Sequence, residues 1–504
     1  MPKTKKTVAT LNGCGRSMGT PKSMNMRLIL PGPRWPWFPL LMGAALRLVN
    51  INAPIIGVHS WRQADTAALA RNFQLNQLPI WLPQVDWGGV SSGYAETDFP
   101  LYSYGVGLLY QFFGLHEWLA RGLSLLCSIG AIYLVQRLGS NLFGQAAGWW
   151  GGLFFAVLPL SVFYGRSVQP EALLMLSSAL ALERGLAYRQ QGGKFNLVLM
   201  GLGLVIASLV KVLPLFWLGI PLLWLGWRRW PLWLAGVIAL LATVAWYAHA
   251  HQLFLETGLS FGFWGSKASR YSWADLLNWR YWGDILLRFS LRGLAVLGLP
   301  LLVFGLWLPK QNEAEGMLPL GLGVVLIAGA LAPSSSYIHE YYQLPLLLFA
   351  CPLLGKAWQK LQQKSTKIGK RWLAVALGLV LIISFTVLQL DYWSKENPNK
   401  SDIWAQAQEI KTTTPKNKPL ISVTAGDPTL LYLSDRKGWL VTPEAVNNEL
   451  LSALRKEGAS AVVGSWNKIE NYSEFKDGPV KQKLAKLLGI NKNQTNGNYI
   501  IILK

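Results

Sequence analysis

Long apolar segments, separated by short polar connections, recur through the first 390 residues of the chain. A helix needs about 20 residues to cross the hydrocarbon core of a bilayer, and fewer where neighbouring helices shield it. Eleven segments satisfy this requirement, and only Lys211 and Pro214 interrupt the stretch that holds the fifth and sixth. We therefore predict a polytopic α-helical membrane protein with about 11 transmembrane helices. They are expected at residues 36–56, 116–136, 146–164, 171–188, 195–210, 213–227, 231–250, 285–308, 317–332, 343–357 and 372–390.

The composition excludes most other classes of protein. Charged residues make up 14% of the 504 residues, whereas a typical soluble domain has about 25%. Hydrophobic residues reach 52%, which excludes a disordered chain. Three scattered cysteines (Cys14, Cys127 and Cys351) do not make a disulfide scaffold.

The formal net charge of +22 comes mainly from the first 390 residues, where 31 basic residues stand against 13 acidic ones. Basic residues are concentrated in the segment 1–35 and in every second predicted loop. Such an excess of Lys and Arg is typical of cytoplasmic loops. No small-residue cleavage site follows the first apolar stretch, so we interpret 1–35 as a cytoplasmic tail before an uncleaved anchor. We predict a multi-pass protein of the plasma (inner) membrane, with a cytoplasmic N-terminus and an extracytoplasmic C-terminus. Membrane lipid, and not nucleic acid, is the expected partner of the positive charge.

Acidic residues of the membrane region gather on the predicted outer side. Only Glu183, Glu313 and Glu315 fall on the cytoplasmic side. The positive-inside rule sorts basic residues and says little about acids, so this asymmetry indicates a chemical role for the outer face. The other ten acids lie in outer loops or at outer ends of spans: Asp65, Asp86, Glu96, Asp98, Glu117, Glu171, Glu256, Asp275, Asp284 and Glu340.

The first outer loop, residues 57–115, is long for a simple connector, which indicates a function. Ser60 followed by Gln63 forms a capping-box pattern, and it predicts an amphipathic helix that lies along the membrane surface. Arg62 and Asp65 share one face of this helix. The helix dipole and Arg62 should keep Asp65 ionised and able to accept a proton or bind a metal. The alternative is that Asp65 only pairs with Arg62 to hold the helix.

Four motifs follow one another between about residues 35 and 390: HSWRQADTAALARNF, ETDFPLYSYGVGLLYQFFG, GRSVQPEALLML and HEYYQLP. Together they resemble bacterial family 39-type glycosyltransferases, membrane proteins of the GT-C fold related to protein O-mannosyltransferases and aminoarabinose transferases. WRQAD is the most specific of these segments. The resemblance implies that residues 36–390 form a transmembrane glycosyltransferase domain. It also implies transfer of a sugar from a polyprenyl-phosphate-linked donor to an acceptor at the outer membrane face, with inversion.

The family places its catalytic carboxylate in the first outer loop, which maps onto Asp65 as the general base or as an acceptor-orienting group. Arg or Lys side chains, or a divalent metal ion as cofactor, would offset the charge of the leaving phosphate. Glu96 and Asp98, just before Pro100 and a second expected amphipathic helix, are the two candidate metal ligands. Aminoarabinose transferases carry a Glu-Lys-Pro-Pro-like motif here. In this chain the acid is displaced and the Lys is absent, which argues against a metal role, and both acids can instead cap the helix.

Two further outer segments supply candidate substrate-binding residues. Glu171 opens the fourth predicted span behind Pro170, an ordinary way to begin a helix. The resemblance places an acid here, facing the same cavity as Asp65, with Arg166 available to contact phosphate. In HEYYQLP, His339 and Tyr342 are candidates for sugar or metal contacts, whereas tandem tyrosines can equally form an interfacial aromatic belt. That segment is not the zinc motif H-E-x-x-H.

Three cations are candidates for binding the carrier phosphate. Lys211 lies in an apolar stretch, where a charge is costly enough to indicate function, although the side chain can also snorkel to the interface. Lys267 and Arg270 lie among aromatic residues in the loop 251–284. Such residues either anchor the loop at the interface or bind a lipid phosphate.

Residues 391–504 are polar, and they alternate strand-like and helix-like patterns. Strands are expected at 419–425, 438–441, 459–463 and 499–503, and helices at 443–456, with Thr442 as N-cap, and at 480–488. We therefore predict a small C-terminal α/β domain on the extracytoplasmic side.

The competing interpretation of the whole chain is a membrane transporter or a flippase for lipid-linked sugars. Transporters place their coupling groups near the bilayer midplane and often contain repeated halves. Here the acids lie at the outer face, in a long structured loop, and no repeat is visible. The glycosyltransferase hypothesis is therefore favoured.

Overall fold

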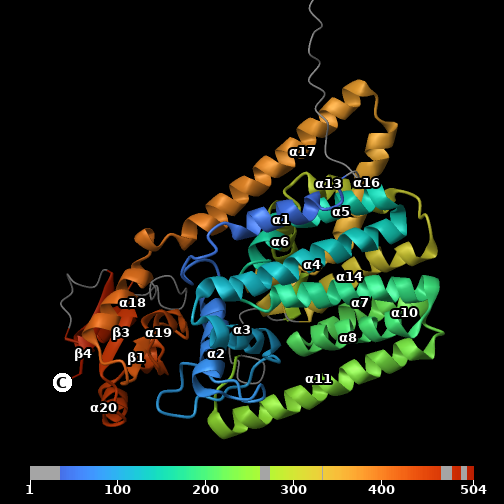
Figure 1. Cartoon of the computed structure of the whole chain (residues 1–504). Coiled ribbons are helices and arrows are strands. Elements are labelled where there is room, and N and C mark those ends of the chain that lie inside the picture. The colour runs from blue at the N-terminus through green and yellow to red at the C-terminus, as the bar shows by residue number, and fades with distance from the viewer. Residues whose placement is uncertain (1–34, 262–272, 332, 467–478, 490–496, 504) are drawn as a thin grey trace, which may run out of the picture. The chain divides into compact units, whose positions relative to one another are not determined.

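The computed structural model describes residues 35–261, 273–331, 333–466, 479–489 and 497–503. These residues form mostly helices, with one small sheet near the C-terminus (Figure 1). The helices are α1 (Phe38–Leu48), α2 (Ser60–Asn76), α3 (Leu101–Phe113), α4 (Glu117–Phe143), α5 (Gln145–Val157), α6 (Pro159–Tyr164), α7 (Glu171–Gln191), α8 (Lys194–Val210), α9 (Pro214–Trp217), α10 (Gly219–Gly226), α11 (Trp230–Thr257), α12 (Trp279–Arg288), α13 (Gly298–Trp307), α14 (Met317–Ala330), α15 (Pro333–Ile338), α16 (Leu346–Lys364), α17 (Lys367–Val387), α18 (Asp402–Thr413), α19 (Thr429–Ser434), α20 (Asn448–Lys456) and α22 (Pro479–Leu487).

Four helical segments in the described part of the chain are long and apolar enough to cross a membrane. They are α4, α11, the segment Glu313–Ala330 that contains α14, and the segment Lys367–Glu396 that begins with α17. A fifth is added if Trp279–Gly293 and Gly298–Trp307, which meet at 101°, form one bent span. The chain is thus a helical, multi-pass membrane protein, and the number of about 11 spans stays a prediction.

Several predicted spans are shorter or broken in the structure, and prolines account for part of this. A proline inside a helix removes a backbone hydrogen bond and clashes with the preceding turn. Pro159 separates α5 from α6, and Pro214 begins the short helix α9 after the break at Lys211. The first predicted span contains only the 11 residues of α1 as helix.

Glycines allow the central helices to approach one another closely. α4 packs against α5 and α7, and α16 packs against α4 and α5 (Figure 1). A Cβ atom at Gly148 would lie 2.0 Å from the hydroxyl oxygen of Ser140, and one at Gly355 would lie 2.1 Å from the carbonyl oxygen of Ala147. Small residues at such interfaces are typical of membrane helix bundles. Because α7 begins at Glu171 and α16 follows the turn Glu340–Gln343, this packing fixes the positions of both segments.

The C-terminal residues contain a four-stranded sheet with the order β2-β1-β3-β4. The strands β1 (Leu420–Val423), β2 (Gly438–Leu440) and β3 (Ala461–Ser465) are parallel, and β4 (Asn498–Ile502) is antiparallel to β3. All four strands lie where the sequence predicts them, as does α22. The predicted helix 443–456 is broken: Thr442 precedes a short 3₁₀ turn, Pro443–Ala445, without a side-chain cap. The helix α20 begins after Asn447, whose side chain accepts a hydrogen bond from the Leu450 amide at 2.7 Å. The domain boundary at residue 391 stays a prediction.

The helix α2 forms where the sequence predicts it, but for a different reason. Its N-cap is His59, in the left-handed conformation with φ of 51°, and not Ser60. The Gln63 amide donates to the carbonyl oxygen of Val58 and accepts from the distant Val168 amide, so no capping box forms. The expected wet face is also absent from this helix, since Gln63–Phe73 is buried throughout. The helices α3 and α19 pack against it.

Candidate active site

Asp65 lies on the buried helix α2, with 5% of its surface exposed. Its carboxylate accepts a hydrogen bond of 2.9 Å from the indole N–H of Trp87, which lies in the same segment 57–115. Arg62 does not form the expected ion pair with Asp65. Its guanidinium instead donates to Asp98 at 2.7 Å. The hypothesis that Asp65 only pairs with Arg62 to hold the helix is therefore wrong.

The burial of Asp65 raises the pKa of its carboxyl group to about 7. The hydrogen bond from Trp87 and the charge of Arg62 lower this pKa, and the charges of Asp86 and Asp427 raise it, but desolvation is the largest effect. The helix dipole and Arg62 are expected to keep Asp65 ionised, which requires a low pKa. This expectation is wrong, because burial raises the pKa instead. A carboxylate that titrates near neutral pH is suited to general-base catalysis.

Asp98 is held by donors from two elements. Its second oxygen accepts from the hydroxyl of Tyr247 on α11 at 2.8 Å, while Arg62 binds the first. Arg62 also lies over the ring of Phe261, 4.8 Å from its centroid. Asp98 therefore fixes the guanidinium of Arg62 and does not cap α3, whose N-cap Pro100 has no side-chain cap.

Glu171 and Lys211 form a second ion pair, with 2.6 Å between the ammonium and the carboxylate. Glu171 is the first residue of α7 and is fully buried, and Lys211 stands at the break after α8. The ammonium also lies 4.2 Å from the ring centroid of Tyr341 and 5.4 Å from that of Tyr342. The other carboxylate oxygen of Glu171 has no hydrogen-bond partner within the described residues. The structure thus brings these three predicted residues, Glu171, Lys211 and Tyr342, together.

Arg62 connects the two ion pairs and Asp65 electrostatically. Burial alone would lower the pKa of its guanidinium. The nearby charges of Asp98, Glu171 and Asp65 outweigh this effect and raise the pKa above its ordinary value. Arg62 thus interacts electrostatically with Asp65, Asp98 and Glu171. These four residues and Lys211 are called the acid–cation cluster below.

Aromatic and imidazole rings line this cluster. His339 stacks on Tyr341 with 5.2 Å between ring centroids and lies 5.5 Å from the rings of His59 and Trp61. Burial, together with the charges of His59 and Lys211, lowers the pKa of His339 to about 3, so its ring is neutral at physiological pH. Its Nδ1 atom has no hydrogen-bond partner in the described structure. Glu340, beside it, is engaged by Tyr164, Tyr392 and Arg292.

A groove of about 460 Å³ opens beside the cluster at His59. Arg288, Arg292 and Glu340 contribute to its walls. His59 was not among the predicted site residues, although it directly precedes SWRQAD. Its left-handed backbone conformation indicates a functional position, because strained residues of this kind cluster at functional sites.

Some predicted residues do not join the cluster. Arg166 is buried and forms its ion pair with Glu396, not with a residue of the cluster. Glu96 accepts a hydrogen bond from Ser260. Lys267 and Arg270 lie outside the described residues.

Glu96 and Asp98 do not fit a metal centre in this arrangement. Protein donors occupy both oxygens of Asp98, and Ser260 binds Glu96. Metal sites need several converging ligands. Within the described residues, no group of three or more His, Cys, Asp or Glu side chains is placed to hold a metal ion.

Comparisons with known proteins show what this chain is similar to in family and in fold. Residues 97–249 match the family model of dolichyl-phosphate-mannose-protein mannosyltransferase. The fold is similar to that of ArnT from Cupriavidus metallidurans bound to undecaprenyl phosphate, with a TM-score of 0.59 and 17% identity over 86% of this chain and 94% of that chain. It is also similar to the apo oligosaccharyltransferase of Archaeoglobus fulgidus, with a TM-score of 0.56 and 12% identity over 86% of this chain and 70% of that chain. The search of curated proteins found no match.

The family match covers α3 to α11, and the similarity of fold covers most of the chain. Together they confirm the resemblance to membrane glycosyltransferases of the GT-C fold that the four sequence motifs predicted.

Proposed function

We propose that the protein transfers a sugar from a polyprenyl-phosphate donor to an acceptor at the outer face of the membrane, with inversion at the anomeric carbon. The observation that carries this proposal is the acid–cation cluster, in which a buried carboxylate with a pKa near 7 lies within electrostatic reach of Arg62. The similarity to a structure bound to undecaprenyl phosphate supports a lipid phosphate as the leaving group.

Asp65 acts as the general base. Its carboxylate takes the proton from the acceptor hydroxyl or amine while the acceptor atom forms a bond to the anomeric carbon. The bond between that carbon and the phosphate oxygen breaks, and its electron pair leaves with the polyprenyl phosphate. A base with a pKa near 7 is about half ionised at neutral pH, so it can accept the proton and later release it to solvent.

The cations of the cluster offset the negative charge that develops on the leaving phosphate. Lys211 and Arg62 are each held in place by an ion pair, Lys211 with the buried Glu171 and Arg62 with the partly exposed Asp98. Lys267 and Arg270 belong to the same proposal as additional phosphate contacts. No reaction step is assigned to a divalent ion.

Two buried polar atoms that have no partner within the described part of the chain are available to the sugar. The free oxygen of Glu171 can accept a hydrogen bond from a sugar hydroxyl, and Nδ1 of His339 can accept or donate one according to its tautomer. Tyr342 lies beside them, next to Lys211. Buried polar atoms that lack partners are costly, and a bound hydroxyl would remove that cost.

The test uses purified protein in sealed vesicles that contain a labelled polyprenyl-phosphate hexose. We expect labelled sugar to leave the lipid and unlabelled polyprenyl phosphate to accumulate when a cell-envelope extract supplies the acceptor. Movement of intact donor between leaflets without cleavage would instead identify a flippase. That outcome would overturn the proposal.

A further inference from the structure

The first outer loop and the C-terminal sheet are joined by backbone hydrogen bonds beside Asp65. The Gly438 amide donates to the carbonyl oxygen of Asp86 at 3.0 Å, and the Gly89 amide donates to that of Gly438 at 2.8 Å. Residues 86–89 therefore lie along the outer edge of β2. A Cβ atom at Gly89 would lie 1.9 Å from the indole nitrogen of Trp439, so only glycine fits this junction.

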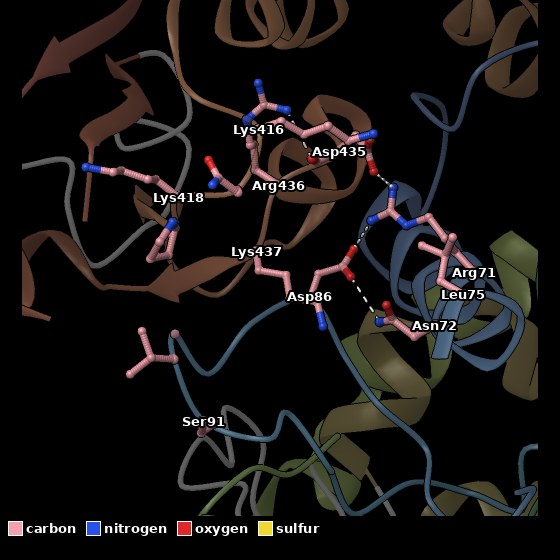
Figure 2. Close-up of a pocket in the computed structure, with 14 residues that line it drawn as sticks. Arg71, Asn72, Leu75, Asp86, Ser91, Lys416, Lys418, Asp435, Arg436 and Lys437 are labelled. Atoms are coloured by element: carbon pink, nitrogen blue, oxygen red, sulfur yellow. Dashed lines mark hydrogen bonds and ion pairs between the residues drawn. The ribbon is translucent and has the colours of Figure 1, made fainter. Parts of the chain in front are cut away.

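A cavity of about 480 Å³ lies at this junction, which is the size of sites that hold small organic ligands. Arg71, Asn72 and Leu75 of α2 form one wall, the loop 86–91 another, and residues 416–419 and 435–437 the rest (Figure 2). Five cationic side chains (Arg71, Lys416, Lys418, Arg436 and Lys437) and two acids (Asp86 and Asp435) line it. The cavity therefore carries an excess of three positive charges.

Two of these cations have structural partners. Arg71 lies between Asp86 and Asp435, 2.9 Å from the latter, and stacks over the ring of Tyr432 (Figure 2). Arg436 donates to backbone carbonyls, including that of Thr414 at 2.7 Å. Neither guanidinium is available to a ligand.

The three lysines differ from the arginines. Lys416 is 3.4 Å from Asp435 and mostly exposed. The ion pairs of this cavity do not include Lys418 or Lys437 among the described residues, although the charge of Asp86 acts on Lys437. Three ammonium groups around one cavity are most readily matched by an anionic group on the ligand. The side chains of Asn417 and Ser91 can donate to or accept from hydroxyl groups, whereas the Asn72 amide group already donates to Gln84 and Asp86 and offers only its oxygen.

The same loop connects this cavity to the catalytic carboxylate. Asp86 faces the cavity and binds Arg71, and the next residue, Trp87, donates to Asp65. Arg71 and Asp65 lie on the same helix. A ligand in the cavity is thus held by the same two elements that position the base.

We propose that this cavity binds an anionic sugar, phosphorylated or carboxylated, as part of the acceptor. The assignment to the acceptor rests on the proposed glycosyltransferase function, whereas binding of the anion does not. The apolar lining is limited to Leu75, Val90 and Pro419, which suits a sugar better than an acyl chain.

The test measures binding by calorimetry with the full-length protein in zwitterionic nanodiscs, without donor. The probes are glucose 6-phosphate, glucuronate and glucose. We expect one or both anions to bind and glucose to bind at least about 10-fold more weakly. Comparing the two anions tells a phosphorylated from a carboxylated acceptor. Glucose binding as tightly as both anions, or no binding of any probe, would overturn the proposal.

A matched pair of variants locates the site. Lys418→Gln/Lys437→Gln should lose about 10- to 100-fold in affinity for the anion, because two charge-assisted contacts are removed. Lys456→Gln/Lys486→Gln removes the same charge from exposed positions of α20 and α22 and should keep the wild-type affinity. Equal affinities of the two double variants would contradict the assignment. Because donor and transfer play no part, this result is independent of the transfer assay.

Discussion

The two ends of α2 carry similar ion pairs that serve different purposes. Near its start Arg62 binds Asp98, and near its end Arg71 binds Asp86 and Asp435. The side chain of Asp98 is 27% exposed, whereas that of Asp86 is 1% exposed and also accepts from Asn72. Glu171 and His339, whose charges or rings face Arg62 or its neighbours, each have a buried polar atom without a hydrogen-bond partner among the residues that the structure describes. The same residue types therefore form a junction in which both Asp86 oxygens have donors at one end, and the proposed catalytic cluster at the other.

Removing the carboxylate between these ends should have the largest effect. Asp65→Asn should lower the transfer rate by about 100- to 10,000-fold, because the proton acceptor is lost. Thermal stability measured at pH 8 should stay the same or rise. The pKa of Asp65 is raised in the folded state, so its ionised form opposes folding above pH 7, and Asn removes that cost. Near-normal turnover in this variant would disprove the assignment of Asp65.

A matched pair of variants on α2, one at each arginine, tests whether the two ion pairs differ in function. Arg62→Gln should raise the donor KM by about 10- to 100-fold, because a charge-assisted phosphate contact is lost, with little change in melting temperature.

Arg71→Gln should lower the stability of the protein and leave donor binding unchanged. It leaves the buried Asp86 without its cation and should cost about 3–5 kcal/mol in the free energy of unfolding, while the donor KM stays near wild type. Steady-state kinetics and thermal denaturation of both variants give the answer. Similar KM increases in both would remove the distinction between a structural and a reactive end.

A smaller effect, on the pH dependence of transfer, tests whether the Trp87 hydrogen bond adjusts the pKa of Asp65. With Asp65 as base, kcat/KM should fall as the pH drops below about 7, because protonation removes the base. The Trp87 hydrogen bond and Arg62 lower this pKa, and Asp86 and Asp427 raise it. Trp87→Phe should therefore move the acidic limb to higher pH, by about one unit or less. A limb that stays in place would show that another group titrates.

The smallest effect is expected from removal of divalent ions. Because protein donors occupy Asp98 and Glu96, we expect the transfer rate with excess chelator to stay within about twofold of the untreated rate. Activity that disappears with chelator and returns with added Mg²⁺ or Mn²⁺ would show that Asp98 exchanges Arg62 for a metal.

Local patterns in the sequence predicted the elements well, and long-range contacts explain where the predictions failed. Apolar runs located the helices and the four strands, because burial and turn residues act over short stretches. The predicted capping box at Ser60 does not form, because the Gln63 side chain accepts a hydrogen bond from the Val168 amide, about a hundred residues away. The polar face expected on α2 is absent because α3, and α19 from the C-terminal segment, pack against this helix.

The candidate site was predicted residue by residue but not as a cluster. Asp65, Glu171 and Lys211 were each selected, yet the Glu171–Lys211 pair joins the start of α7 to the break after α8 and cannot be read from spacing. The partner of Asp65 is Trp87, not Arg62, since the fold of the loop decides which donor reaches the carboxylate. Desolvation then reverses the direction of the expected pKa shift.

The central claim is that Asp65 performs chemistry and does not merely hold the donor. Donor binding and release of polyprenyl phosphate can be measured on one preparation of wild type and of Asp65→Asn, in a single turnover with saturating acceptor. The account predicts donor dissociation constants that agree within about threefold, with carrier released only by the wild type. Release by Asp65→Asn at the wild-type rate would contradict it.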